Sequence, residues 1–390
     1  MRESTPKTVK QQLATMKDTA ELMIDLAYSA VTYDNKTIAE EVLVLEEYMD
    51  DIQQSARQSL MLASRTPEDA DQLIGIFNVV AAAEEIADAA DDIASIVTDD
   101  QPVPDAFRAA LIQSKEITVR IPYQGTAMDG KTVTEFEQET GAGTQIIAMK
   151  RTDGWVFDPT DDLVLEEEDV LYVRGPKETV EGVYERMTDR EFAFEFQASE
   201  TIDTRFDDIV DTLIEMKNTM ELAIGLGYSA ALFNNENIAT KVLNLETKMD
   251  TMRDDVHTEI LRQAGAEQDI DTLRSLSTIA SCNEIISDAA LQIAAAVLRE
   301  QRLHPVLLEA IQDTDEIITQ VEVAHGSDLD GLQIDTLEKD AETGTTVMAI
   351  QRADSWQYNP ATRTTIDGGD LLIVRVPTAH ESQIRAMARQ

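Results

Sequence analysis

Cysteine and long apolar runs are nearly absent from this chain of 390 residues. The single cysteine, Cys282, has no second thiol in the chain to pair with, so an intrachain disulfide is excluded and a reducing compartment is expected. The most apolar run, residues 74–83, is about half as long as the roughly 20 residues that a bilayer-spanning helix needs. The N-terminal segment MRESTPKTVKQQL lacks the apolar stretch of a signal peptide. The sequence therefore predicts a soluble, cytoplasmic protein.

Basic residues are also scarce. The chain has 32 Lys and Arg against 75 Asp and Glu, which gives a net charge of −43. Because there is no basic stripe, direct binding to nucleic acid is not expected. The acids are spread along the whole chain, and at molar salt the screening length falls to roughly 3 Å, so that such a surface becomes tolerable. We interpret the composition as that of an extremely halophilic protein; the functional alternative is a surface that binds cations or a basic partner.

What the chain does contain is an internal repeat. Residues 16–30 read MKDTAELMIDLAYSA and return at 216–230 as MKNTMELAIGLGYSA, with 10 of 15 positions identical. Further on, residues 143–159 reappear at 344–360, after the gain of one residue. A period of about 200 residues is far too long for a solenoid. It indicates a tandem duplication of a multi-domain unit.

Within each half the hydrophobic period changes from helix-like to strand-like. Up to about residue 115, apolar side chains recur at steps of three and four, which predicts long amphipathic helices in a bundle and a shorter helix near 104–115. From Glu116 the period is two, and Ile117, Val119 and Ile121 predict a strand. Further strands are expected at 144–150, 155–157 and 170–173, and helices at 132–139 and 177–187.

The expected fold class is α+β, with two helical bundles alternating with two small α/β modules. Residues 191–204 (EFAFEFQASETIDT) show no helical stripe and are interpreted as an extended linker between the halves. The expected boundaries are 1–115 for the first bundle, 116–190 for the first module, 191–204 for the linker, 205–314 for the second bundle and 315–390 for the second module.

Both kinds of segment resemble known domain families. The helical parts resemble PhoU-like domains through their acidic helices, IAEEVLVLEEYMDDI (38–52) and AEEIADAADDIA (83–94). The α/β parts resemble the TrkA-C domain, also called RCK-C, through GKTVTEF (130–136), IIAMKR (146–151) and LEEEDVLYVRG (165–175). Together the two resemblances cover nearly the whole chain.

The resemblance implies a function only at the level of class. TrkA-C domains are cytoplasmic regulatory modules of cation channels and transporters, often dimeric, that bind a small ligand. PhoU-like domains regulate or accompany membrane transporters, and some hold metal clusters. The combination implies a non-enzymatic regulatory subunit of a membrane cation channel or transporter, for potassium or magnesium, at the inner face of the membrane. A homodimer or an intrachain pseudo-dimer is expected; the alternative is a metal-binding regulator of phosphate uptake or signalling.

Paired acids on the helices are the candidate metal ligands. In each half, two Glu-x-x-x-Asp pairs place carboxylates one helical turn apart. If the second and third helices face each other, the four carboxylates converge on a site suited to Mg²⁺, Mn²⁺, Ca²⁺ or iron. The alternative is a solvated flank of an acidic helix. The candidate residues are Glu46, Asp50, Glu84 and Asp88 in the first half and Glu246, Asp250, Glu284 and Asp288 in the second.

Arg151 and Arg352 end equivalent strands and are the candidate ligand contacts of the modules. In a chain so poor in bases, they could hold a ligand phosphate or pair with Asp153 and Asp354. The two interpretations are left open. The copies have also diverged, since Gly225 stands where the first half has Asp25.

Signals for catalysis are weak. Residues 125–132 match the phosphate-binding pattern G-x-x-x-x-G-K-[ST], but the second half has Leu332 and Gln333 in place of Lys131 and Thr132, so the glycines are interpreted as turn residues and an NTPase is not expected. All histidines lie in the second half, which argues against a duplicated zinc site. These are His257, His304, His325 and His380.

Overall fold

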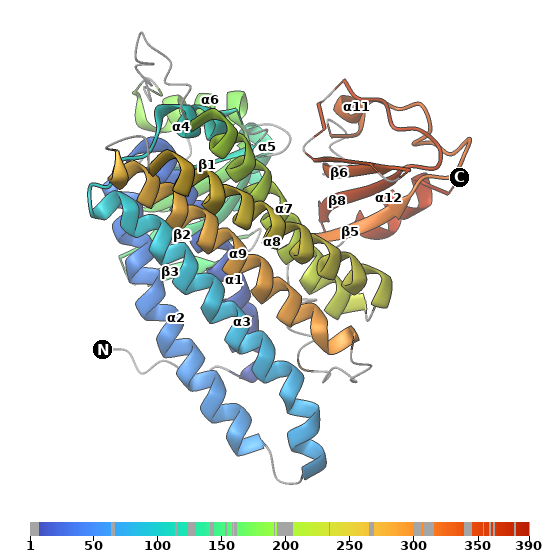
Figure 1. The fold of residues 1–390 in the computed structure, drawn as a ribbon, viewed down its shortest axis with the longest axis horizontal. Coiled ribbons are helices and arrows are strands. Elements are labelled where there is room, and N and C mark those ends of the chain that lie inside the picture. Colours follow the sequence, from blue (N-terminus) through green and yellow to red (C-terminus); the bar gives the residue numbers. More distant parts are fainter. Residues whose placement is uncertain are drawn as a thin grey trace.

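The computed structural model is mostly helical, with two small antiparallel sheets attached to the helices (Figure 1). Within the described part of the chain, no helix is long and apolar enough to cross a membrane. The structure describes residues 8–63, 67–113, 116–123, 130–140, 144–152, 154–157, 159, 162–190, 192, 206–233, 235–264, 269–298, 306, 316–338, 345–353, 355–358, 360–361, 363–377 and 380–389.

The first half begins with an antiparallel helical bundle. The hydroxyl of Thr8 accepts the N–H of Gln11, whose side chain accepts the N–H of Thr8, and this capping box starts the first helix. Asp34 ends that helix with a φ of 50°, and the Asn35 side chain accepts backbone N–H groups in the first turn of the next helix. So short a connection makes the two helices antiparallel neighbours. The elements are α1 (Val9–Tyr33), α2 (Lys36–Ala63), α3 (Pro67–Thr98) and the short α4 (Asp105–Ile112).

The second bundle has the same order of long helices and packs directly against the first. Alanine-rich faces of α3 and the third helix of the second bundle lie against each other, and one continuous core of buried side chains runs through both bundles. The Tyr28 hydroxyl donates a hydrogen bond of 2.6 Å to Asn283 across this boundary. The two halves are therefore joined by a shared core. The elements are α7 (Asp207–Phe233), α8 (Glu236–Ala264) and α9 (Ile270–Leu298).

The first module is a four-stranded antiparallel sheet with strand order β1-β4-β2-β3. Its outer strand pairs Glu116 with Pro176, and a bulge lies between Ile146 and Ala148. A separate small core, which includes Phe136 and Val173, is buried between the sheet and its helices. The elements are β1 (Glu116–Pro122), α5 (Val133–Thr140), β2 (Gln145–Arg151), β3 (Gly154–Phe157), β4 (Val170–Pro176) and α6 (Lys177–Thr188).

The second module has the corresponding strand order, β5-β8-β6-β7, again antiparallel throughout. The bulge recurs between Val347 and Ala349, and the module has its own core around Ile334 and Val374. The elements are β5 (Glu316–Glu322), α11 (Ile334–Glu338), β6 (Thr346–Arg352), β7 (Ser355–Tyr358), β8 (Leu371–Pro377) and α12 (Glu381–Met387).

The predicted change of period is confirmed, because strands begin at Glu116 and again at Glu316. The strand predicted at 170–173 continues to Pro176, since it lies between β1 and β2 and pairs along both of its edges. The predicted linker lies outside the described residues except for Phe192, whose ring packs edge-on against Tyr184. The modules, expected as α/β units, have sheets in which all neighbouring strands are antiparallel. Only β2–β3 and β6–β7 join consecutive strands directly, whereas the first two strands of each module lie on either side of its last strand and are connected through α5 or α11.

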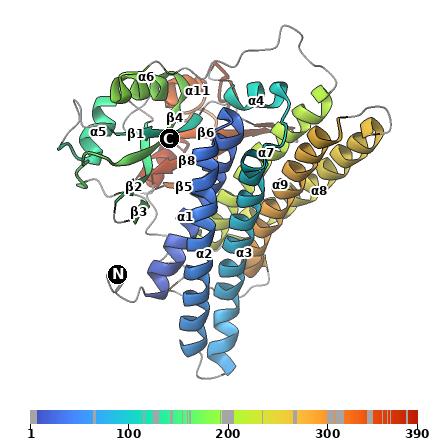
Figure 2. The same ribbon diagram turned by 90° about the vertical axis from the view of Figure 1, so that its left-hand side faces the viewer.

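Each module lies against the first helix of its own half through its outer strand, and both sheets stand on the α1 side of the bundle (Figure 2). In the first half, the Ser29 hydroxyl donates to the carbonyl of Thr118 at 2.8 Å. The buried carboxylate of Glu41 forms ion pairs with Arg120 at 3.0 Å and Lys150 at 3.1 Å. In this way α1 and α2 hold the sheet by specific polar contacts.

Candidate functional site

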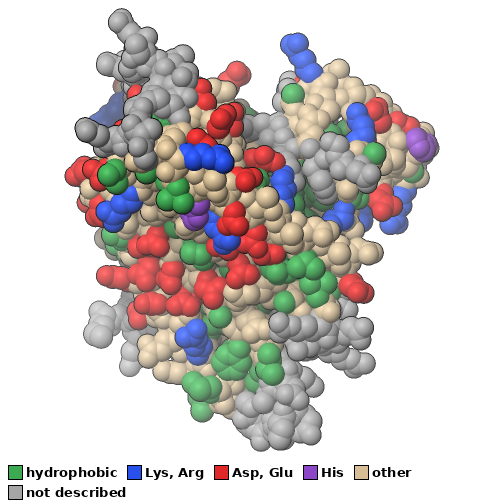
Figure 3. Space-filling model, viewed as in Figure 1, with side chains coloured by type: hydrophobic (Ala, Val, Ile, Leu, Met, Phe, Trp, Pro, Cys, Tyr) green, Lys and Arg blue, Asp and Glu red, His purple; other side chains and the backbone are tan. Residues whose placement is uncertain are grey.

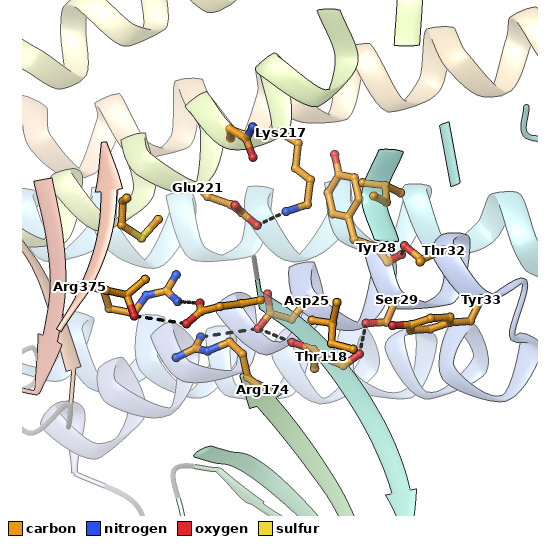
Figure 4. Close-up of a pocket in the computed structure, with 16 residues that line it drawn as sticks. Asp25, Tyr28, Ser29, Thr32, Tyr33, Thr118, Arg174, Lys217, Glu221 and Arg375 are labelled. Carbon is orange, nitrogen blue, oxygen red and sulfur yellow. Dashed lines mark hydrogen bonds and ion pairs between the residues drawn. The ribbon is translucent and has the colours of Figure 1, made fainter. Parts of the chain in front are cut away.

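A polar cavity of about 100 Å³ lies between the two halves. Its walls come from α1 and α7 of the bundles and from β1, β4, β6 and β8 of the modules. Figure 4 shows charged side chains from these elements converging on one space, among them Asp25, Arg174, Glu221 and Arg375. A second cavity of similar volume adjoins it and shares these four side chains.

Glu116 and Arg375 form a close ion pair in this cavity. Arg375 Nη1 lies 2.7 Å from Glu116 Oε2, and the Thr346 hydroxyl donates to the other carboxylate oxygen at 3.3 Å. Burial would raise the pKa of Glu116, but the guanidinium groups of Arg375 and Arg174 outweigh it and hold the pKa below its usual value. This pair also joins β1 of the first module to β8 of the second.

Asp25 is held much more loosely. Its carboxylate lies 3.7 Å from Arg174 Nη1 and accepts a long hydrogen bond of 3.4 Å from the Thr118 hydroxyl. Burial raises the pKa of Asp25, Arg174 opposes this, and the nearby Glu221, itself paired with Lys217, raises it further. The carboxylate of Asp25 is therefore paired less closely than that of Glu116.

Sequence reasoning did not identify this cavity. The signals that could have found it are the change from Asp25 to Gly225 between the repeats and the retention of Arg174 as Arg375. Neither signal shows which strands and helices meet, because the contact between Glu116 and Arg375 joins residues 259 positions apart.

The acidic pairs of the first half face one another, as the metal-site prediction required. Glu46 and Asp50 lie on α2, and Glu84 and Asp88 lie on α3. Burial raises the pKa of Glu46, and Asp50, Asp91 and Asp88 raise it further; burial, Glu84 and Asp50 likewise raise the pKa of Asp88. Figure 3 shows acidic side chains gathered in a belt across the helices of this face.

Asp91 is the most perturbed member of this first acidic cluster, defined as Glu46, Asp50, Glu84, Asp88 and Asp91. Burial, followed by repulsion from Asp92 and Asp88, raises its pKa to about 6. One of its carboxylate oxygens is buried and lacks a hydrogen-bond partner among the described residues. Within the same residues, however, no three Asp, Glu, His or Cys side chains approach closely enough to form a ready-made metal site. Metal binding here stays a prediction.

The second acidic cluster is formed by the equivalent residues Glu246, Asp250, Glu284 and Asp288, and it includes a cation of its own. Arg253 lies 2.6 Å from Glu284 and 3.2 Å from Asp250. The first half has Gln53 at this position. Arg57 reaches Glu84 there only at 3.9 Å.

Arg151 and Arg352 are both paired with an aspartate of their own module. Arg151 contacts Asp169 through two nitrogens at 3.0 and 3.1 Å, and Arg352 contacts Asp370 at 2.8 and 2.6 Å. Each arginine also donates to a backbone carbonyl of the loop before that aspartate. The partners named from sequence, Asp153 and Asp354, lie outside the described residues. These hydrogen bonds occupy several of the five N–H groups of each guanidinium, which a ligand phosphate would also need.

The described part of the phosphate-loop-like segment serves local structure. Thr132 caps α5 by a reciprocal pair of hydrogen bonds with Glu135, and Lys131 forms an ion pair with Glu139 at 2.5 Å. Residues 125–129 of the pattern lie outside the described residues.

Comparison with known proteins identifies the domains of the first half. The family model of the PhoU domain matches residues 13–97, and that of the TrkA-C domain matches residues 117–188. The chain thus contains a PhoU helical bundle followed by a TrkA-C domain, both from regulatory families. No curated protein matches the chain.

Similar solved structures are found at low identity. The crystal structure of PhoU from Pseudomonas aeruginosa is 13% identical, with a TM-score of 0.40, over 75% of this chain and 96% of that chain. The GsuK RCK domain is 11% identical, with a TM-score of 0.19, over 71% of this chain and 64% of that chain. The GsuK channel bound to NAD is 11% identical, with a TM-score of 0.20, over 80% and 66%. These scores are too low to support an argument about function.

Proposed function

We propose that this chain is a cytoplasmic regulatory subunit of a membrane cation channel or transporter, for potassium or magnesium, which responds to a small ligand. The observation that carries the proposal is the presence of a PhoU domain and a TrkA-C domain in one chain. We also propose that the halves arose by tandem duplication and act as an intrachain pseudo-dimer. The matching strand orders and helix orders support this second point.

A regulatory subunit needs a mechanical connection between its ligand-binding and partner-binding parts. Here the connection is polar and direct: Glu41 of α2 holds Arg120 of β1 and Lys150 of β2. A ligand that shifts the sheet moves Arg120 and Lys150 relative to Glu41. Because charge-assisted hydrogen bonds are strong and depend on geometry, this movement is transmitted to α2. We include ligand binding by Arg151 and Arg352 in this proposal. To bind a ligand, each arginine would have to release its aspartate, Asp169 or Asp370, or use N–H groups that do not contact it.

Recovery of the partner tests the proposal most directly. The affinity-tagged chain is expressed in its native host, and solubilised membranes are purified over the tag at the host's working salt. We expect an integral membrane protein of a potassium or magnesium transport system to co-purify, whereas a tagged unrelated acidic protein recovers none. If repeated purifications with crosslinking recover no membrane protein above that control, docking on a transporter is wrong.

A second candidate function is metal-dependent regulation of phosphate uptake or signalling through the bundles. A specific observation favours it: in the first acidic cluster a buried oxygen of Asp91 has no hydrogen-bond partner among the described residues, and Gln53 stands at the position of Arg253. Oxygen ligands of this kind suit Mg²⁺, Mn²⁺, Ca²⁺ or iron. Elemental analysis of protein purified without chelator is expected to find a metal that is lost on Glu84→Ala and kept on Glu284→Ala. Metal-free protein would eliminate this candidate.

A further inference from the structure

Reciprocal contacts cross the boundary between the two halves. The ammonium group of Lys17 lies 5.4 Å from the centre of the Tyr228 ring. In the opposite direction, the ammonium group of Lys217 lies 5.1 Å from the centre of the Tyr28 ring. The two lysines occupy equivalent positions of the repeat, and so do the two tyrosines. A contact made in both directions between equivalent residues is characteristic of an isologous interface, in which two copies of one surface face each other.

One contact at this boundary is made in one direction only. The side-chain amide of Gln292 on α9 donates a hydrogen bond of 2.6 Å to the carboxylate of Glu85 on α3. The mirror contact would join Asp92 to Ile285, which occupy the equivalent positions. An isoleucine side chain has no group that could bond the aspartate. Both acidic positions of the first half are thus uncharged in the second half.

Asp92 also lies close to the second half. Burial raises the pKa of the Cys282 thiol on α9 to about 12, and the negative charge of Asp92 contributes to this rise. Because Cys282 is only 2% exposed, the charge of Asp92 acts on a buried group across the boundary. A carboxylate at position 92 is therefore placed where its charge reaches a facing half.

These positions determine which halves fit together. If two first halves faced each other, each Glu85 would meet Asp92 of the other copy, and two pairs of like charges would lie at the boundary. If two second halves faced each other, each Gln292 would meet Ile285 and lose its carboxylate partner. Both like pairs therefore lose the hydrogen bond of the unlike pair, and the pair of first halves adds repulsion.

The hydrogen bond between Tyr28 and Asn283 strengthens the boundary but does not select the partner. Ala83 is the equivalent of Asn283, and the Tyr228 hydroxyl accordingly has no hydrogen-bond partner among the described residues. A pair of first halves would have no tyrosine–asparagine bond and a pair of second halves would have two, whereas each unlike pair has one. The total is the same in either arrangement, so the selection of the partner depends on the one-way contact between α3 and α9.

We propose that this boundary is a pairing surface specific for unlike halves, on which a first half accepts a second half and excludes another first half. The partner that fits is the second half of this chain. The hydrogen bond from Gln292 to Glu85 favours it, and repulsion between Glu85 and the Asp92 of another copy excludes the like pair. The inference rests on the pseudo-dimer of the proposed function and deepens it, but it does not depend on a transporter.

The full-length chain, cut once after folding, tests the proposal. A protease site is placed within residues 194–203 of the predicted linker, and size-exclusion chromatography over a dilution series measures how tightly the cut halves associate. We expect the wild-type halves to stay together. Gln292→Glu keeps the shape of the side chain but gives it the charge of the first half, and it should weaken the association by at least about tenfold at the lowest salt at which the wild type stays folded.

Two measurements separate repulsion from misfolding. Molar salt should restore most of the association of Gln292→Glu, because it screens the repulsion between carboxylates. Adding Glu85→Gln to that variant should restore association at low salt, because an amide again faces a carboxylate. Asn244→Asp, at an exposed position of α8, is the matched control for the added charge, and circular dichroism follows the folding of each variant.

The possible failures are distinguishable. Wild-type halves that separate on cutting would contradict the pseudo-dimer together with the pairing surface. Halves that stay together would overturn the specificity alone if Gln292→Glu leaves their association unchanged, or weakens or unfolds them irrespective of salt and of Glu85→Gln. Neither result concerns docking on a transporter, which the co-purification tests separately.

Discussion

The two halves of this chain differ in charge at equivalent contacts between bundle and module. In the first half, the buried Glu41 holds Arg120 and Lys150, whereas the equivalent helix position in the second half is Lys241, which donates to Gln351 at 3.4 Å. In the acidic clusters the change runs the other way. The first cluster contains Asp91, one carboxylate oxygen of which has no hydrogen-bond partner among the described residues, and the second has Arg253 among its carboxylates.

The two acidic clusters show that the same arrangement of helices can reduce the repulsion between carboxylates in two ways. Arg253 neutralises the second cluster from within the chain, and the aspartate at position 91 is replaced by Leu291. In the first cluster Arg57 reaches Glu84 only at 3.9 Å, so more of the repulsion is left to protons, to screening by salt or to a bound cation. Burial and mutual repulsion raise carboxyl pKa values in both clusters, and the pKa of Asp91 in the first cluster rises to about 6. Carboxyl groups of both halves therefore bind protons more tightly than they would in free solution, and Asp91 is the one whose shift is large.

The largest effect is expected at the first bundle–module interface. Glu41→Ala leaves Arg120 and Lys150 without their buried partner, which should destabilise the first module by about 3 kcal/mol. Urea unfolding followed by the fluorescence of Trp155, in a Trp356→Phe background, reports on that module alone. The matched change Lys241→Ala should cost less than about 1 kcal/mol. Equal losses at the two positions would mean that the halves do not differ here.

The next effect concerns the cation inside the second cluster. Arg253→Gln introduces the residue of the first half and leaves Glu284 and Asp250 without their shared partner. The expected loss is about 2 kcal/mol at low salt, and it should shrink as salt is raised because the remaining repulsion is screened. Arg262→Gln, at an exposed position, is the control. A loss that is independent of salt would assign Arg253 a packing role.

Asp91 provides the pH test of the first cluster. Its pKa is raised to about 6, so the folded state binds a proton more tightly than the unfolded state does. Stability from this group is therefore present at low pH and is lost as pH rises from about 4 through 6. Asp91→Asn should flatten that slope and stabilise the protein at neutral pH by about 1 kcal/mol after allowance for solvent screening. An unchanged slope in thermal melts across this range would contradict the assignment.

The smallest effect should come from transplanting the arginine. Gln53→Arg places a guanidinium group where the second half has Arg253, and it should lower the response of the melting temperature to added Mg²⁺. Wild type should show the larger rise on Mg²⁺ addition, whereas Glu284→Ala, in the other cluster, should leave that rise in place. If Gln53→Arg melts with the same Mg²⁺ response as wild type, the first cluster is not where the ion acts.

Prediction from sequence succeeded where the determining interactions are local. The strand that begins at Glu116 follows from an alternation of apolar and polar side chains over a few residues. The prediction for Arg151 was incomplete. Its observed partner, Asp169, lies 18 residues further along the chain, and the pattern of residues around the strand does not show that this loop returns to Arg151. Sequence reasoning also found the acids on α2 and α3, but the buried oxygen of Asp91 depends on how deeply those helices pack.

The sequence by itself determined the periodicity of each segment, the repeat, the charge balance and the families of the first two domains, because these depend on residue order alone. Only the tertiary structure decided that the halves share one core, that Glu116 meets Arg375, and that Asp25 and Ile318 line the same cavity. These contacts join residues hundreds of positions apart. Their geometry is set by the packing of whole helices and sheets, which no short pattern encodes.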